Sequence, residues 1–163
     1  CGFDFVQSRD EPLAGLWLAR FTTAPLPFYW GEVEPVRGEP RLDRLVDAAE
    51  WFRSHGVALK GHPLVWHTVT APWLLDLPLE EVEAAQRERI RRDVGRFRGL
   101  VGTWDAINES VIMPVFDNGD NGITRLAAAK GRLGMIRLAA GVGAFEKDFL
   151  GGRFQTGLLE DQS

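Results

Sequence analysis

The chain has 163 residues, 45% of them hydrophobic, which suits one globular domain with its own core. Its net charge of -4 comes from interspersed acidic and basic residues, so no basic stripe is available for a phosphate backbone and we expect no nucleic acid partner. The apolar runs fall short of the roughly 20 residues that a membrane-spanning helix needs, and a single cysteine excludes an internal disulfide framework.

The first half of the chain predicts a strand, a helix and a second strand. Residues 20–30, "RFTTAPLPFYW", are β-branched, aromatic and interrupted by prolines, which is typical of a short strand and the loop that follows it. Apolar residues then recur at helical spacing over 42–52, and a glycine stop follows at Gly56. The nearly continuous apolar run 57–66 predicts a strand that is buried on both faces of a parallel sheet.

The second half continues this alternation. Residues 79–97 predict a helix with one apolar face, whose other face is charged and is expected to be solvated. Residues 100–107 predict a third strand, and a third helix is expected over 124–138. The glycine-rich segment 139–163 breaks the pattern, so we expect a domain over 1–138 and a divergent tail over 139–163.

Alternating strands and helices predict an α/β fold with a parallel sheet and outer helices. Three strands do not complete a closed eight-stranded barrel, which needs roughly 250 residues, so we expect a partial barrel. Such a sheet would leave two open edges and a wide apolar face in water. We therefore predict a homo-oligomer, most simply a two-fold dimer.

Polar and aromatic side chains follow the end of each predicted strand. Tyr29 and Trp30 follow the first strand, His62 to His67 ("HPLVWH") the second, and Asn108 and Glu109 the third. Because the carboxyl ends of parallel strands meet at one edge of the sheet, these groups are candidates for a common site.

Several other kinds of site fit the sequence poorly. His62 and His67 are five positions apart and would point to opposite faces of a strand, so we expect no metal site. The Gly-x-Ser-x-Gly motif of serine hydrolases is absent. "DNGDNG" at 117–122 lacks the ligands of a calcium loop and is interpreted as a polar loop. No cofactor is expected.

The remaining chemistry is that of a sugar site. Indole rings stack on the apolar face of a pyranose, while amide and imidazole groups hydrogen-bond its hydroxyls, and Glu109 can act as a general acid. Adjacent residues of a regular strand face opposite ways, so Asn108 and Glu109 can share a site only if the strand ends or bulges there.

Three motifs resemble glycoside hydrolase family 10, the retaining β-xylanases with a (β/α)8 barrel. They are "YWGEVEPVRG" at 29–38, "KGHPLVWH" at 60–67 and "WDAINE" at 104–109, in the order and spacing of strands 2 to 4 of that family. The resemblance covers about residues 20–138. It implies that Glu109 is the acid/base, that Asn108 contacts the sugar 2-hydroxyl, and that His62 and Trp66 line the glycone side. Tyr29, Trp30 and His67 are further candidates for substrate binding.

The chain also departs from the family pattern. Leu26 and Tyr29 stand where the family usually has the Asn and Lys of Asn-x-x-Lys-Trp, and Val69 replaces a Gln. The family's nucleophile belongs to a later strand, near the seventh, that this sequence does not contain. The acids Glu32, Glu34, Asp105 and Asp117 have no spacing that marks any of them as a replacement.

Two functions stay open on this evidence. One is a retaining, xylanase-like enzyme or enzyme fragment that acts on β-linked plant polysaccharide. The other is a catalytically impaired remnant that binds carbohydrate. The resemblance implies a secreted protein, although this sequence does not open on a signal peptide.

Overall fold

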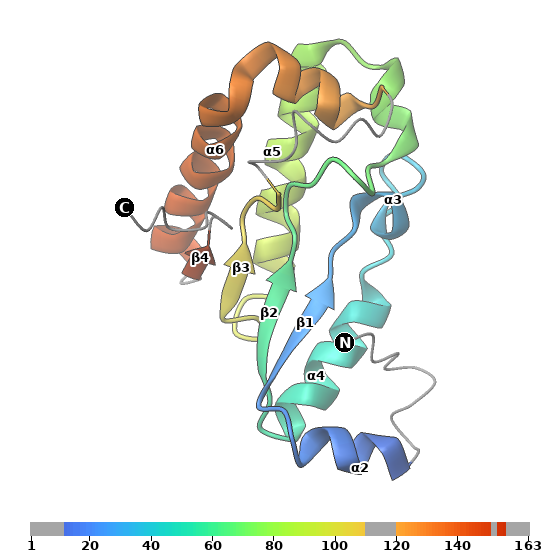
Figure 1. Cartoon of the computed structure of the whole chain (residues 1–163), viewed down its shortest axis with the longest axis vertical. Helices are drawn as coiled ribbons and strands as arrows, with labels where there is room; N and C mark the ends of the chain where they lie inside the picture. Colours follow the sequence, from blue (N-terminus) through green and yellow to red (C-terminus); the bar gives the residue numbers. More distant parts are fainter. Residues whose placement is uncertain (1–11, 110–119, 151–152, 156–163) are drawn as a thin grey trace.

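The computed structural model describes residues 12–109, 120–150 and 153–155. One parallel sheet has the order β1-β2-β3-β4, as Figure 1 shows. Its strands are β1 (Thr23–Pro27), β2 (Ala58–His62), β3 (Thr103–Asp105) and β4 (Arg153–Gln155). The helices are α2 (Pro12–Leu18), α3 (Trp30–Val33), α4 (Asp43–Ser54), the 3-10 turn η1 (Pro72–Asp76), α5 (Leu79–Arg96) and α6 (Gly122–Leu150).

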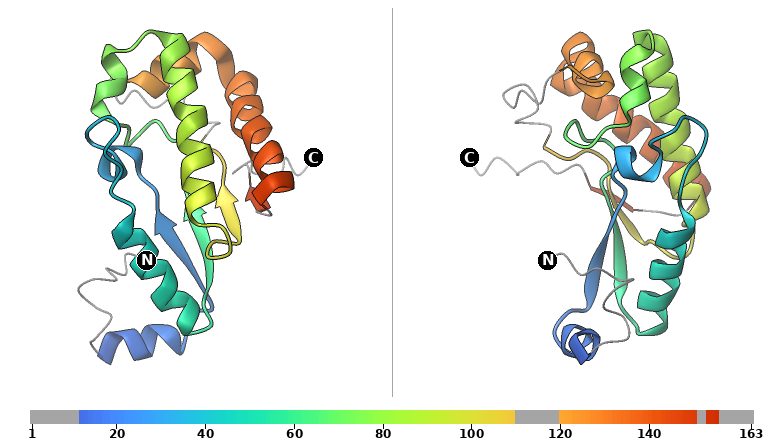
Figure 2. Two further views of the ribbon diagram at one scale, coloured as in Figure 1. Left: turned by 180° about the vertical axis from the view of Figure 1, so that it is seen from behind. Right: turned by 90° about the vertical axis from the view of Figure 1, so that its right-hand side faces the viewer.

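The predicted fold class is confirmed. Strands β1, β2 and β3 and helix α5 lie inside the ranges expected from the sequence, helix α4 extends two residues beyond its expected range and ends before the glycine stop at Gly56, and every strand pairing is parallel. Helices α4 and α5 lie on the same side of the sheet (Figure 2). The architecture is therefore part of a (β/α)8 barrel, with parallel strands inside and helices outside.

Helix α6 is longer than predicted, and β4 was not predicted. The helix begins directly after Asn121, whose Oδ1 accepts hydrogen bonds from the backbone N–H groups of Ile123 (3.0 Å) and Thr124 (2.9 Å). It is kinked at Gly131, where φ is 67°, and continues to Leu150. The domain boundary after residue 138 stays a prediction. Among the described residues, no helix has the length and apolar character of a membrane-spanning segment.

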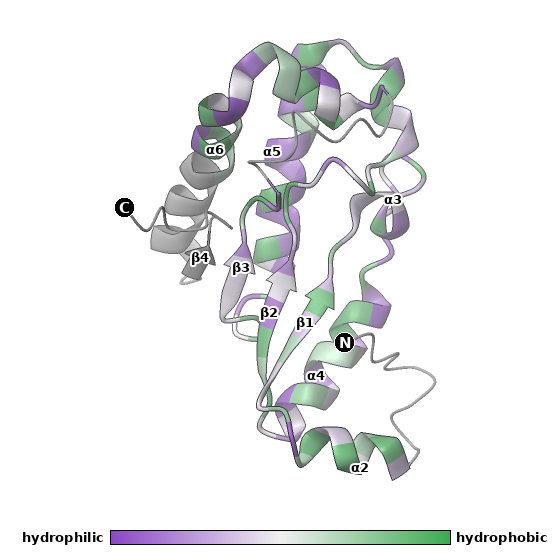
Figure 3. Ribbon diagram, in the orientation of Figure 1, coloured by the Kyte–Doolittle hydropathy of each residue, from purple (hydrophilic) through white to green (hydrophobic). Residues whose placement is uncertain are grey.

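The charged residues of α5 are not all on a solvated face, which corrects the sequence prediction. Gln86, Arg89 and Asp93 are at most 2% exposed. They follow Val82 at helical spacing and so share its inward stripe. Figure 3 shows that α5 carries both hydrophilic and hydrophobic residues along its length.

The hydrophobic core lies between the sheet and its helices. Ala24 and Leu26 of β1, Leu59 of β2 and Trp104 of β3 are each at most 4% exposed. Phe28 continues this inward row, and its ring lies 4.7 Å from that of Trp104. Their alternation with exposed neighbours is the period-2 pattern of strands that pack on helices.

The opposite face of the sheet is largely polar. Register pairs Pro25 with Lys60 and Lys60 with Thr103, and the next row places Pro27 beside His62. Its described residues therefore do not form the wide apolar face that we expected from the sequence.

Prolines also modify the free edge of β1. Phe28 donates its N–H to His62 O on β2 (2.7 Å), so by alternation the backbone nitrogens of Pro25 and Pro27 face away from β2. Proline has no N–H to donate, and this edge therefore lacks two donors that an added strand would need.

We expect Gly61→Ala to destabilise the fold by about 1–3 kcal/mol, because a Cβ at position 61 would overlap the indole ring of Trp104. Gly102→Ala is the matched control, since a Cβ there meets no atom within 4 Å. Urea unfolding of both variants measures the difference. Equal stability of the two would contradict the close approach of β2 to Trp104.

Candidate active site

Three aromatic side chains meet at the carboxyl ends of β1 and β2. The ring of Tyr29 lies 5.4 Å from that of Trp66 and 6.2 Å from that of His62, and His62 lies 6.4 Å from Trp66. All three are half-buried. We call Tyr29, His62 and Trp66 the aromatic cluster. The structure thus brings together three of the residues selected from the sequence.

Glu109 joins this cluster through Trp66, whose Nε1 donates to Glu109 Oε2 at 2.6 Å. Strand β3 ends at Asp105, and Glu109 has the left-handed φ of 54°. The strand therefore ends before Asn108 and Glu109, which is the condition for both side chains to serve one site. A non-glycine residue in this region carries conformational strain, which is a frequent property of functional sites.

Backbone hydrogen bonds hold the two loops together beyond the regular strands. Val65 N–H donates to Ala106 O (3.1 Å), and Asn108 N–H donates to Val65 O (2.9 Å). The loop that carries Trp66 is therefore fixed against the loop that carries Glu109. The side chain of Asn108 is half-buried at the same end of the sheet.

The orientation of His62 is set by its contact with Asp105, which also pairs with Lys60. Asp105 Oδ2 lies 2.7 Å from His62 Nδ1 and 2.8 Å from Lys60 Nζ. Burial alone would raise the pKa of Asp105, but the contacts with His62 and Lys60 outweigh it and lower that pKa. An ionised carboxylate only accepts hydrogen bonds, so Nδ1 carries the proton and Nε2 is left as a hydrogen-bond acceptor. Sequence reasoning missed Lys60, although its spacing of two from His62 on a strand indicates a shared face.

Two other predicted substrate contacts, His67 and Trp30, are buried. His67 is 0% exposed, and neither ring nitrogen has a partner among the described residues, so its placement disagrees with a direct sugar contact. Trp30 is 3% exposed and donates Nε1 to Glu34 Oε2 at 3.1 Å. It opens α3, and this change from strand to helix turns it away from its neighbour Tyr29 toward α5.

The acids that were considered from the sequence as a second carboxylate lie in different surroundings. Asp105 is held by Lys60 and His62, Glu34 is held on the side of α5 by Trp30 and Arg92, and Glu32 is exposed on α3. Asp117 lies outside the described residues. In the described part of the chain, two acids contact the aromatic cluster: Asp105, which is also paired with Lys60, through His62, and Glu109 through Trp66.

The sequence model of glycosyl hydrolase family 10 matches residues 25–128. The chain belongs to this family. A β-1,4-xylanase of Dictyoglomus thermophilum is 36% identical over 69 residues, which are 42% of this chain and 19% of the relative. An endo-1,4-β-xylanase A of Humicola insolens is 33% identical over 84 residues, which are 50% of this chain and 22% of the relative.

Solved structures agree on the fold. An endo-1,4-β-xylanase from Caldicellulosiruptor owensensis superposes with a TM-score of 0.72 at 20% identity, covering 91% of this chain and 46% of that one. A psychrophilic family 10 endo-β-1,4-xylanase gives 0.70 at 24% identity, covering 89% and 48%. This chain thus spans about half the length of these structures and less of the curated relatives.

The pH dependence of stability tests the buried state of His67. Burial lowers the pKa of His67 below its ordinary 6.5, while the charge of Glu109 acts in the opposite direction. The unfolded chain therefore takes up this proton at higher pH than the folded one, and stability is lost as pH falls below about 6.5. We expect His67→Gln to remove this part of the pH dependence. Urea unfolding between about pH 8 and pH 5 measures it, and parallel profiles for the two proteins would contradict the assignment.

Proposed function

We propose that this protein is a retaining glycoside hydrolase of the endo-β-1,4-xylanase type, with Glu109 as general acid and base. The contact of Glu109 with Trp66 carries the proposal, because it sets a carboxyl group beside the aromatic cluster of Tyr29, His62 and Trp66. Aromatic faces with one carboxyl group suit a pyranose and its glycosidic oxygen. The xylanases among the relatives support β-linked xylan as the substrate class.

Each residue has a distinct role in this proposal. Trp66 and Tyr29 stack on the sugar rings, and His62 and Asn108 hydrogen-bond hydroxyl groups on the glycone side. Asp105 fixes the tautomer of His62. His67 and Trp30, which the sequence also suggested as contacts, are buried and have no direct role in this proposal.

The proposed chemistry needs a second carboxylate. In a retaining enzyme one carboxyl group protonates the leaving oxygen while another, about 5 Å away, attacks the anomeric carbon. Glu34 and Asp105 are committed to ion pairs. This favours a second candidate function, a remnant that binds β-linked oligosaccharides without turning them over.

We expect Glu109→Gln to lower the hydrolysis of a xylo-oligosaccharide at least about 100-fold, because the leaving oxygen loses its proton donor. With a dinitrophenyl β-xylobioside the first, glycosylation step needs no proton, so its burst should be far less affected. Glu50→Gln, an exposed residue of α4, is the matched control.

The outcomes separate the two functions. Equal losses for both substrates would contradict the acid role of Glu109. If the unaltered protein binds xylo-oligosaccharides, seen as a change in tryptophan fluorescence, but forms no product, the binding remnant is correct. Absence of both binding and turnover would contradict both functions.

We retain the homo-oligomer as a proposal, with a restricted contact surface. Pro25 and Pro27 oppose strand addition at the β1 edge, so association is expected to use other surfaces. Sedimentation velocity at micromolar concentration measures it. A single monomeric species would contradict the proposal.

A further inference from the structure

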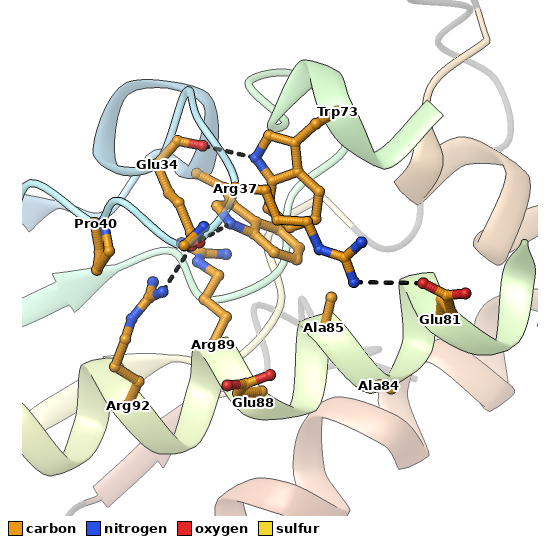
Figure 4. Close-up of a pocket in the computed structure, with 12 residues that line it drawn as sticks. Glu34, Arg37, Pro40, Trp73, Glu81, Ala84, Ala85, Glu88, Arg89 and Arg92 are labelled. Atoms are coloured by element: carbon orange, nitrogen blue, oxygen red, sulfur yellow. Dashed lines mark hydrogen bonds and ion pairs between the residues drawn. The ribbon is translucent and has the colours of Figure 1, made fainter. Parts of the chain in front are cut away.

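A pocket lies between α3 with the loop that follows it, η1 and α5 (Figure 4). Its volume is about 370 Å³, which lies within the range of small-ligand sites. Neither Glu109 nor any residue of the aromatic cluster lines it. Trp30, which lies next to Tyr29 in the chain, forms part of its wall. We call this space the rear pocket.

One wall of the rear pocket is fixed by Glu34. Its carboxylate accepts from Arg92 Nη1 (2.7 Å), Gly38 N–H (2.9 Å) and Trp30 Nε1 (3.1 Å). Its backbone oxygen accepts from Trp73 Nε1 (3.0 Å). Burial raises the pKa of Glu34, but these donors outweigh it and hold the pKa below its usual range. Both indoles are therefore held in place, and Trp73 is set edge-on to Trp30 at 5.6 Å.

Other groups at the pocket retain unused capacity. Glu88 has no ion-pair partner among the described residues, and Arg92 Nη2 is a buried donor without an acceptor there. Arg37 lies over the ring of Trp73 at 5.6 Å and reaches Glu81 at 3.4 Å. That ion pair is about half exposed, so Arg37 is a displaceable cover on the indole.

The charge of the lining selects the ligand class. Three arginines and three glutamates line the pocket and balance one another: Arg37, Arg89, Arg92, Glu34, Glu81 and Glu88. The glutamates would repel an anionic ligand, and the arginines would repel a cationic one. In the described residues no group of three or more acidic, His or Cys side chains could hold a metal ion. A neutral ligand with several hydroxyl groups and one apolar face matches both signs of charge and the indole.

We propose that the rear pocket is a second carbohydrate site, which binds one or two neutral pyranose units. The sugar ring takes the place of Arg37 on Trp73. Glu88 accepts from its hydroxyl groups, and Arg92 Nη2 donates to one of its oxygens. This binding does not depend on catalysis by Glu109.

The six tryptophans of the chain make the test direct, because each indole N–H gives one signal in a spectrum of ¹⁵N-labelled protein. Titration with xylobiose, and separately with cellobiose, should shift the signals of Trp73 and Trp30 in a saturable way, with a Kd on the order of 1 mM or weaker. Trp66 reports the cleft in the same spectrum. Sorbitol, which has no ring, is the ligand control.

Two variants separate binding from a general effect. We expect Glu88→Ala to weaken the Trp73 response about five-fold and Ala85→Phe, whose side chain points from α5 toward Trp73 and Arg37 (Figure 4), to abolish it. Both should leave the Trp66 response unchanged, as should Glu50→Ala as surface control. Absence of a saturable Trp73 response, an equal response to sorbitol, or an unaltered response in both variants would overturn the proposal. Glu109→Gln should change only the Trp66 response, so failure of the proposed catalysis is distinguishable.

Discussion

The site depends on one buried guanidinium. Arg89 is 2% exposed, and it donates to the carbonyl oxygens of Phe28, Pro63 and Leu64 at the ends of β1 and β2. Those oxygens belong to residues that have left the regular ladder, so burying them without a donor would cost free energy. A single side chain of α5 thereby fixes the two segments that carry Tyr29 and Trp66.

The buried charge of Arg89 needs a nearby negative charge to stabilise it. Burial lowers the pKa of Arg89 to about 10, and the charge of Asp93, one helical turn away at 3.3 Å, acts against that shift. Arg92 in turn joins Asp93 to Glu34. Because removing one member leaves an unpaired buried charge, the network holds together as a unit, and it also forms the wall of the rear pocket.

Much of this arrangement could be predicted from sequence because it follows periodicity. The β-branched and aromatic residues around β1 and the helical spacing of α4 predicted these elements correctly, and the parallel sheet then required strand ends to converge. The ends of three strands brought Tyr29, Trp66 and Glu109 to one place for that reason. The position of Lys60 on the same face of β2 as His62 could also have been predicted, from their spacing of two residues, but this prediction was not made.

The other features of the site depend on tertiary contacts, which leave no periodic pattern in the sequence. An Arg and an Asp four apart on a helix are typical of a surface ion pair, and only the carbonyl oxygens around Arg89 distinguish this one. Tyr29 and Trp30 were both expected to contribute to one site at the end of the first strand, but the helix that begins at Trp30 separates their side chains. His67 lies in the same motif as His62, yet it is enclosed by the core.

The departures on β1 determine how the proposed cleft would recognise a sugar. Leu26, at a position where the family pattern has Asn, is 2% exposed and belongs to the core, and Tyr29 replaces a Lys and joins the aromatic cluster. In the proposed site, the side chain that the wall at the end of β1 contributes to hydrogen bonding is the Tyr29 hydroxyl. Recognition on this wall therefore rests on ring stacking, which tolerates changes in hydroxyl pattern more than paired polar contacts do. Under the proposed function, the selection of a particular sugar would then fall to His62 and Asn108, on the neighbouring strand ends.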